Sequence, residues 1–149
     1  MKNLILSTAV LFTLTVNALA APKDPVSIKV QETFNQIFKN AADVSWTVNG
    51  SNSDAFFTVD GIKTRATLNA NGTLIQTIRY YSEEHLPASV LYNIKKSYKS
   101  KEIFGVTEVS NHNGINYRIV LKDDKHYTFI NANSSGDNEV VKKYKRGDK

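Results

Sequence analysis

Apolar positions recur with the period of an α-helix in two stretches of the chain. The residues between them are mostly polar or charged, so each stretch places its apolar side chains along one side of a helix. In the second stretch Leu86-Pro87 comes first, and proline is well tolerated in the first turn of a helix. The first stretch contains Val30, Phe34, Ile37, Phe38 and Ala41, and the second contains Val90, Leu91, Ile94 and Tyr98.

Elsewhere apolar and polar residues alternate with the period of a β-strand, and turn residues separate the runs. Asp60-Gly61, Asn71-Gly72 and Asn113-Gly114 are hairpin signals, and the polar residues 49–54 are expected to form a loop. The connections are too short for parallel crossovers, so the strands must pair in antiparallel fashion. Strands are expected near residues 44–48, 55–59, 63–69, 74–81, 103–110, 115–122, 126–131 and 139–144.

Apolar residues also match between the two halves of the chain at a nearly constant offset. Phe57 matches Tyr117 at an offset of sixty, and residues 68–71 match residues 130–133 at sixty-two. This similarity predicts an α+β fold made by a tandem repeat of one helix plus four antiparallel strands. The expected units cover about residues 26–81 and 82–145, with both helices packed on one face of a broad antiparallel sheet.

The first twenty residues read as a secretory signal peptide. Lys2 is their only charge, residues 4–16 are mostly apolar, and Ala18-Leu19-Ala20 fits the small-x-small cleavage pattern. We therefore expect a signal peptide over residues 1–20, a single domain over residues 21–149, and a periplasmic or secreted protein. No later apolar run is long enough to predict a membrane span.

Several of these positions together resemble a known family. They are Phe34, Phe38, Asn40-Ala41, Val44 and Trp46, the turns at Asp60-Gly61 and Asn69-Ala70-Asn71-Gly72, and Leu86-Pro87 with Val90, Ile94 and Tyr98. This set resembles the PepSY-like proteins, also called beta-lactamase-inhibitor-like, which are exported proteins of Bacteroidetes-type bacteria. The chain departs from the family pattern at Lys39 and Lys99. The resemblance implies a helix-free sheet face and a non-enzymatic binding or inhibitor-like module.

Composition and charge exclude several functions. The chain has no cysteine, which excludes disulfides, thiol chemistry and cysteine-based zinc sites. Its formal net charge is +5, and the basic residues are spread along the chain apart from a short group at residues 142–146. A nucleic-acid binder concentrates its bases on one face, so no nucleic-acid partner is expected.

No residue pattern points to catalysis or to a cofactor. His85, His112 and His126 have no helical spacing, and no Gly-x-Ser-x-Gly motif occurs. The acidic pairs Glu83-Glu84 and Asp123-Asp124 occupy a helix start and a turn, where solvated carboxylates are ordinary. We expect a protein that is not an enzyme, with no metal and no cofactor.

The repeat predicts which side chains lie on the helix-free face. If Leu68 and Ile130 point to the core, then alternation places on the opposite face Arg65, Thr67, Arg118, Tyr127 and Phe129, with Arg79, Tyr81 and Asn116 beside them. Arginine and aromatic residues together are typical of a binding surface. A register shifted by one residue would instead place Tyr127 and Phe129 in the core. Trp46 alternates with two valines and is expected in the core.

Three functions fit these observations. The first is an exported binding or inhibitor-like module whose open sheet face contacts a protein or peptide. The second is a periplasmic binder of a small ligand or a cell-envelope polymer, with the same face as a groove. The third is a structural protein that pairs through its sheet edges.

Overall fold

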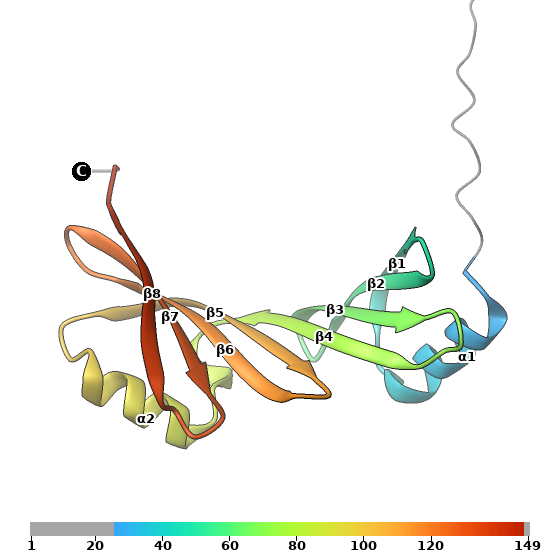
Figure 1. Ribbon diagram of the computed structural model, residues 1–149, viewed down its shortest axis with the longest axis horizontal. Coiled ribbons are helices and arrows are strands. Elements are labelled where there is room, and N and C mark those ends of the chain that lie inside the picture. The colour runs from blue at the N-terminus through green and yellow to red at the C-terminus, as the bar shows by residue number, and fades with distance from the viewer. Residues whose placement is uncertain (1–25, 148–149) are drawn as a thin grey trace, which may run out of the picture.

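The computed structural model describes residues 26–147, and the expected signal peptide lies outside these residues (Figure 1). The described part of the chain is dominated by strands and contains two α-helices. In chain order the elements are α1 (Ile28–Ile37), β1 (Ala42–Asn49), β2 (Asn52–Val59), β3 (Ile62–Asn69), β4 (Leu74–Tyr81), the 3₁₀ helix η1 (Glu83–His85), α2 (Ala88–Ser97), β5 (Glu102–Asn111), β6 (Gly114–Lys122), β7 (His126–Asn133) and β8 (Asn138–Lys145).

All eight strands belong to one antiparallel sheet, in the order of the sequence from β1 to β8. The predicted fold class, a tandem repeat of one helix plus four strands, is wrong as a description of this architecture. Its expected boundary falls between β4 and β5, yet these strands pair directly through six residue pairs, from Gln76 with Asn111 to Tyr81 with Val106. The hydrogen-bonded ladder therefore runs without interruption through the middle of the sheet.

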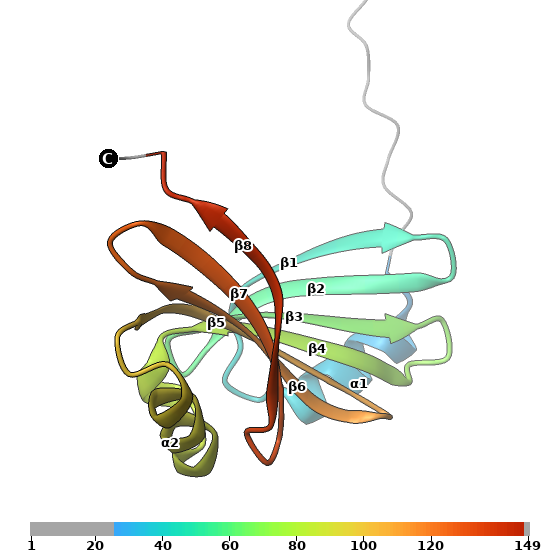
Figure 2. The same ribbon diagram turned by 60° about the vertical axis from the view of Figure 1, so that its left-hand side comes forward.

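Each α-helix covers a separate group of buried residues, and the two helices lie at opposite ends of a strongly twisted sheet (Figures 1 and 2). The Ser27 side chain caps α1 by accepting a hydrogen bond from the Val30 N–H. The core under α1 consists of Val30, Phe34, Ala55, Phe57, Ala66 and Leu68. The core under α2 consists of Leu86, Val90, Ile94, Ile103, Val106, Tyr117, Ile119, Leu121, Ile130 and Ala132.

The strand registers divide the side chains between two faces, because residues directly opposite one another in a ladder share a face. The helix-bearing face is marked from β2 to β7 by Phe57, Thr64, Arg79, Glu108, Tyr117 and Ala132. The open face is marked by Phe56, Arg65, Ile78, Val109, Asn116 and Asn133. Both cores lie on the helix-bearing face, so no helix of the described chain covers the open face.

A polar group lies on the helix-bearing face between the two cores. Glu108 accepts a hydrogen bond from the Tyr81 hydroxyl at 2.6 Å and forms an ion pair with Arg79 at 3.3 Å. Burial and the hydrogen bond to Glu108 raise the pKa of Tyr81 far above its ordinary value. The expectation that Arg79 and Tyr81 share the open face is wrong, because the ladder places Ile78 opposite Arg65.

The predicted apolar stripes differ from the structure in two places. Ile37 is 46% exposed, because α1 ends there and only Val30 and Phe34 of the helix are fully buried. Trp46 is half-buried rather than enclosed, and its ring meets the Phe34 ring edge-on with centroids 5.0 Å apart. Near this position β1 has a register shift and a positive φ at Asp43, which interrupt the alternation that the sequence suggested.

Phe34 is the central ring of the core under α1. It contacts the rings of Phe38, Trp46 and Phe57 at centroid distances of 5.2, 5.0 and 5.0 Å. Phe34→Ala should therefore lower the unfolding free energy by about 3–5 kcal/mol. Ile37→Ala, on the same helix but exposed, should change it by no more than about 0.5 kcal/mol. Urea unfolding of both variants measures the difference, and equal losses would contradict the assigned helix face.

Candidate binding face

The five predicted contact residues all occupy open-face positions of the sheet. Arg65 and Thr67 lie on β3, Arg118 on β6, and Tyr127 and Phe129 on β7. The alternative register is wrong, because Thr128 and Ile130 are the buried residues of this part of β7. The five side chains are nevertheless spread over both halves of the sheet and have different surroundings.

In the first half of the sheet, the open face is organised around a buried carboxylate. The Asp54 side chain is only 6% exposed and accepts hydrogen bonds from Arg65 Nε at 3.2 Å and Arg65 Nη2 at 3.1 Å. The Thr67 hydroxyl and the Asn49 amide donate to the same carboxylate. The Arg65 guanidinium also lies 5.7 Å from the centroid of the Phe56 ring. Arg65 is therefore fixed by its neighbours and is not a freely moving surface cation.

Asp54 was missed by reasoning from the sequence, because it follows Asn49-Gly50-Ser51-Asn52 in a run of turn residues. The hairpin turn is tighter than this composition suggested, and β2 already begins at Asn52. Asp54 is thus a strand residue directly opposite Thr67. The available signal was an acidic residue three positions after the Gly50-Ser51 turn, which alternation places on the same face as Arg65 of the next strand.

In the second half of the sheet, the open face carries four aromatic rings accompanied by basic side chains. We call this group the aromatic–cation cluster: Phe104, Tyr127, Phe129 and Tyr144 with Lys122, Lys142 and Arg146. Phe104 is the most exposed of these rings, at 57%. Sequence reasoning found Tyr127 and Phe129 but not Phe104 or Tyr144, because it did not establish the registers of β5 and β8 against β7.

The rings of the aromatic–cation cluster contact one another in pairs, and three of the rings also have a cation over them. Phe104 meets Tyr127, and Phe129 meets Tyr144, each pair edge-on with centroids 5.5 Å apart. Lys122 lies 5.3 Å from the Phe104 centroid, Lys142 lies 4.6 Å from Tyr144, and Arg146 lies 5.6 Å from Tyr127. These contacts hold long side chains in place on a surface that remains accessible.

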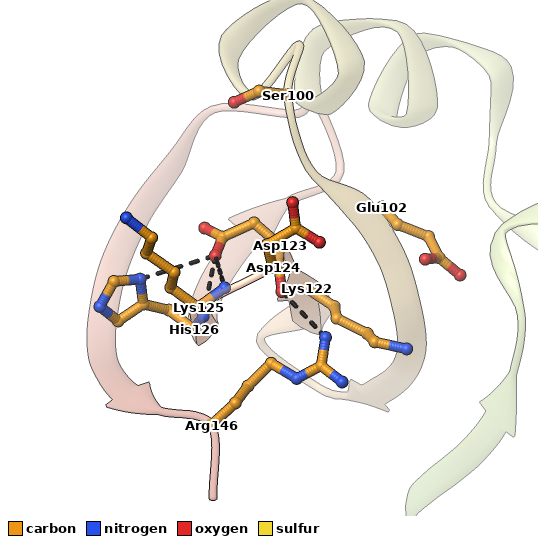
Figure 3. A pocket seen from close by; sticks show the side chains of 8 residues that line it. All are labelled: Ser100, Glu102, Lys122, Asp123, Asp124, Lys125, His126 and Arg146. Atoms are coloured by element: carbon orange, nitrogen blue, oxygen red, sulfur yellow. Dashed lines mark hydrogen bonds and ion pairs between the residues drawn. The ribbon is translucent and has the colours of Figure 1, made fainter. Parts of the chain in front are cut away.

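The β6–β7 turn anchors one edge of this cluster and borders a surface hollow (Figure 3). The Asp123 carboxylate accepts backbone hydrogen bonds from Lys125 and His126 and forms an ion pair with Lys101. The Lys101 contact and the Lys125 N–H hold the pKa of Asp123 well below its ordinary value. Arg146 donates to the Asp123 carbonyl at 3.1 Å, which places its guanidinium beside the Tyr127 ring.

The described residues show no group that would bind a metal. Within residues 26–147, no three His, Cys, Asp or Glu side chains come together in a way that could hold an ion. The hollow in Figure 3 has acidic and basic side chains on its rim, including Glu102, Lys122 and Arg146.

None of the helices within residues 26–147 is long and apolar enough to cross a membrane.

Comparison with solved structures places this arrangement among known folds. A BLIP-like protein from Bacteroides fragilis NCTC 9343 matches with a TM-score of 0.64 at 19% identity, over 83% of this chain and 90% of that chain. A DUF2874 family protein from Bacteroides ovatus ATCC 8483 matches with a TM-score of 0.63 at 19% identity, over 84% and 91%. A proposed periplasmic protein from Bacteroides eggerthii DSM 20697 matches with a TM-score of 0.62 at 17% identity, over 81% and 89%.

The chain has a BLIP-like fold. The antiparallel sheet expected from the sequence is thereby confirmed, together with the beta-lactamase-inhibitor-like part of the resemblance. No family model matches the chain, and no curated protein is similar to it in sequence at a significant level. At these identities the likeness concerns the BLIP-like fold and does not transfer the activity of any neighbour.

The buried carboxylate on the open face predicts a pH dependence of stability. Burial raises the pKa of Asp54, but hydrogen bonds from Thr67, Arg65 and Asn49 outweigh burial and hold the pKa below its ordinary value. The ionised group therefore stabilises the fold above the unfolded-state pKa of about 3.9, and this stabilisation disappears as the pH falls through the folded-state pKa.

Asp54→Asn should lower the unfolding free energy at neutral pH by about 1–3 kcal/mol, because it leaves the Arg65 guanidinium poorly paired. The variant should also lose less stability than the wild type when the pH is lowered from about 5 to about 3. Urea midpoints at several pH values measure both effects. Glu32→Gln, at an exposed position of α1, is the control and should follow the wild type. Parallel pH profiles for Asp54→Asn and the wild type would contradict this role.

Proposed function

We propose that this chain is an exported, non-enzymatic binding module that contacts a protein or peptide with the open face of its sheet. The observation that carries the proposal is the aromatic–cation cluster, a set of exposed and half-buried rings held in pairs on a surface that no helix within residues 26–147 covers. The aromatic residues Tyr and Trp, with Arg, are enriched at binding hot spots, because they bury much area in contact with a partner.

The side chains of the open face are held in place by their neighbours, as expected of a contact surface. A side chain that is already ordered before binding loses less conformational freedom when the partner arrives. In the first half of the sheet Asp54 fixes Arg65 and Thr67, and in the second half Lys142 and Arg146 pack against Tyr144 and Tyr127. The proposed contact residues are therefore Arg65, Thr67, Arg118, Tyr127 and Phe129, extended by Phe104 and Tyr144.

The proposal includes membership of the PepSY-like family and export from the cytoplasm. Residues 1–20 supply the signal peptide in this account, with cleavage after Ala20. A BLIP-like fold and a proposed periplasmic neighbour agree with a binding module outside the cytoplasm. The likeness to BLIP-like and DUF2874 family proteins supports a non-enzymatic role for this chain.

The experiment is affinity capture from a periplasmic extract of the source organism, with the purified chain and its variants as bait. The double variant Tyr127→Ala/Phe129→Ala should reduce recovery of a saturable partner at least about tenfold, because loss of a hot spot costs about 2 kcal/mol or more. Its unfolding free energy should fall by less than the loss of about 3–5 kcal/mol expected for a core ring such as Phe34, because Phe129 is exposed and Tyr127 is half-buried. Arg65 is left intact, since its removal would unpair the buried Asp54.

Tyr92→Ala provides a matched control on the other side of the molecule. Tyr92 lies on α2, is 64% exposed and has Lys96 at 5.9 Å from its ring centroid, so it has the same chemistry away from the open face. This variant should capture the partner as the wild type does. Unchanged capture by the double variant, or loss of capture by Tyr92→Ala instead, would show that the open face is not the contact surface.

A further inference from the structure

We infer that the partner segment docking on the aromatic–cation cluster is acidic, and that it presents carboxylates next to apolar or aromatic side chains. This inference rests on the proposed function and adds the chemistry of the partner. It commits to a protein segment and not to a nucleic acid, a membrane or an inorganic polyanion.

Basic side chains outnumber acidic ones around the cluster. The open-face positions of β6 and β8 supply three cations, and Arg146 follows β8 and adds a fourth over Tyr127. Only two carboxylates, Glu102 and Glu139, lie at open-face positions of β5 to β8. The three cations on β6 and β8 counted above are Arg118, Lys122 and Lys142. A partner with negative charge is therefore favoured over a basic one.

The β6–β7 turn adds two carboxylates beside the cluster, Asp123 and Asp124, and the first of them is already paired. Asp123, in the β6–β7 turn, pairs with Lys101 and accepts two backbone N–H groups, so it does not offset Lys122 or Arg146 through its side chain. In the first half of the sheet the balance differs, because Asp54 pairs with Arg65 directly on the open face. The excess of positive charge is thus located at the aromatic rings and not spread evenly over the face.

The cations are held where an incoming carboxylate would meet them. Lys122, Lys142 and Arg146 each lie over a ring, and that contact limits the motion of otherwise flexible side chains. A carboxylate can pair with the ammonium or guanidinium group while its neighbouring side chain packs on the same ring. A purely polyanionic ligand would use the cations and leave the exposed edges of Phe104 and Phe129 in water.

The test uses two short synthetic peptides that share one length. In the first, glutamate alternates with tyrosine and leucine, and in the second glutamine replaces every glutamate. Fluorescence anisotropy with the purified chain should show the glutamate peptide binding at least about tenfold more tightly at low salt. Added salt should weaken this binding, because exposed charges are screened.

Variants separate the contribution of the cations from that of the rings. The double variant Lys122→Gln/Lys142→Gln should lose at least about tenfold in affinity for the glutamate peptide, and Tyr127→Ala/Phe129→Ala should lose as much. Lys96→Gln, which removes the cation over Tyr92 on α2, is the matched control and should bind as the wild type does. The salt titration of the wild type needs no variant, so the inference can be tested even if one variant fails to fold.

Three results would overturn the inference. The first is equal affinity for the two peptides, and the second is binding that is insensitive to salt. The third is a glutamate-peptide signal that inorganic polyphosphate displaces fully while Tyr127→Ala/Phe129→Ala has no effect, which would indicate a simple polyanion surface. If any of these occurred while the ring variants still abolished partner capture, the open-face function would stand and the acidic partner would not.

Discussion

Hydrogen bonding between β4 and β5 joins the two halves of the chain into a single sheet. The β4–β5 ladder has no register shift, so the row of paired residues that runs from Phe57 on β2 to Ala132 on β7 stays on one face of the sheet. Both cores then fall on the helix-bearing face, and the opposite face is left open. A shift of one residue in this ladder would reverse the faces of every strand that follows it.

The centre of that ladder has to accommodate polar groups between two apolar cores. Glu108 would be costly to bury alone, and its contacts with Arg79 and Tyr81 satisfy the charge where the cores meet. On the open face the buried Asp54 carboxylate is likewise paired, with Arg65. These two networks use similar chemistry on opposite faces, one between the cores and the other beneath a candidate contact surface.

The sequence could predict the elements that depend on local periodicity and turn chemistry. Strand β4 has the bounds that the pattern indicated, and the Asp60-Gly61 hairpin lies where its turn residues placed it. Features that depend on pairing between distant strands could not be predicted in this way. The continuous sheet, the face of Arg79 and the burial of Asp54 all depend on how neighbouring strands pair, and the pattern within one strand does not show this. The tandem-repeat fold class was wrong because offsets compare positions along the chain and do not show which strands pair.

In the function proposed above, the partner lies on the open face, over the rings of β5 to β8. Hydroxyl-radical footprinting of the captured complex, read out by mass spectrometry, tests it most directly. Oxidation of Phe104, Phe129 and Tyr144 should fall strongly when the partner binds, while oxidation of Tyr92 on α2 should stay at the level of the free protein. Protection of Tyr92 with the three open-face rings still oxidised would show that the partner binds elsewhere.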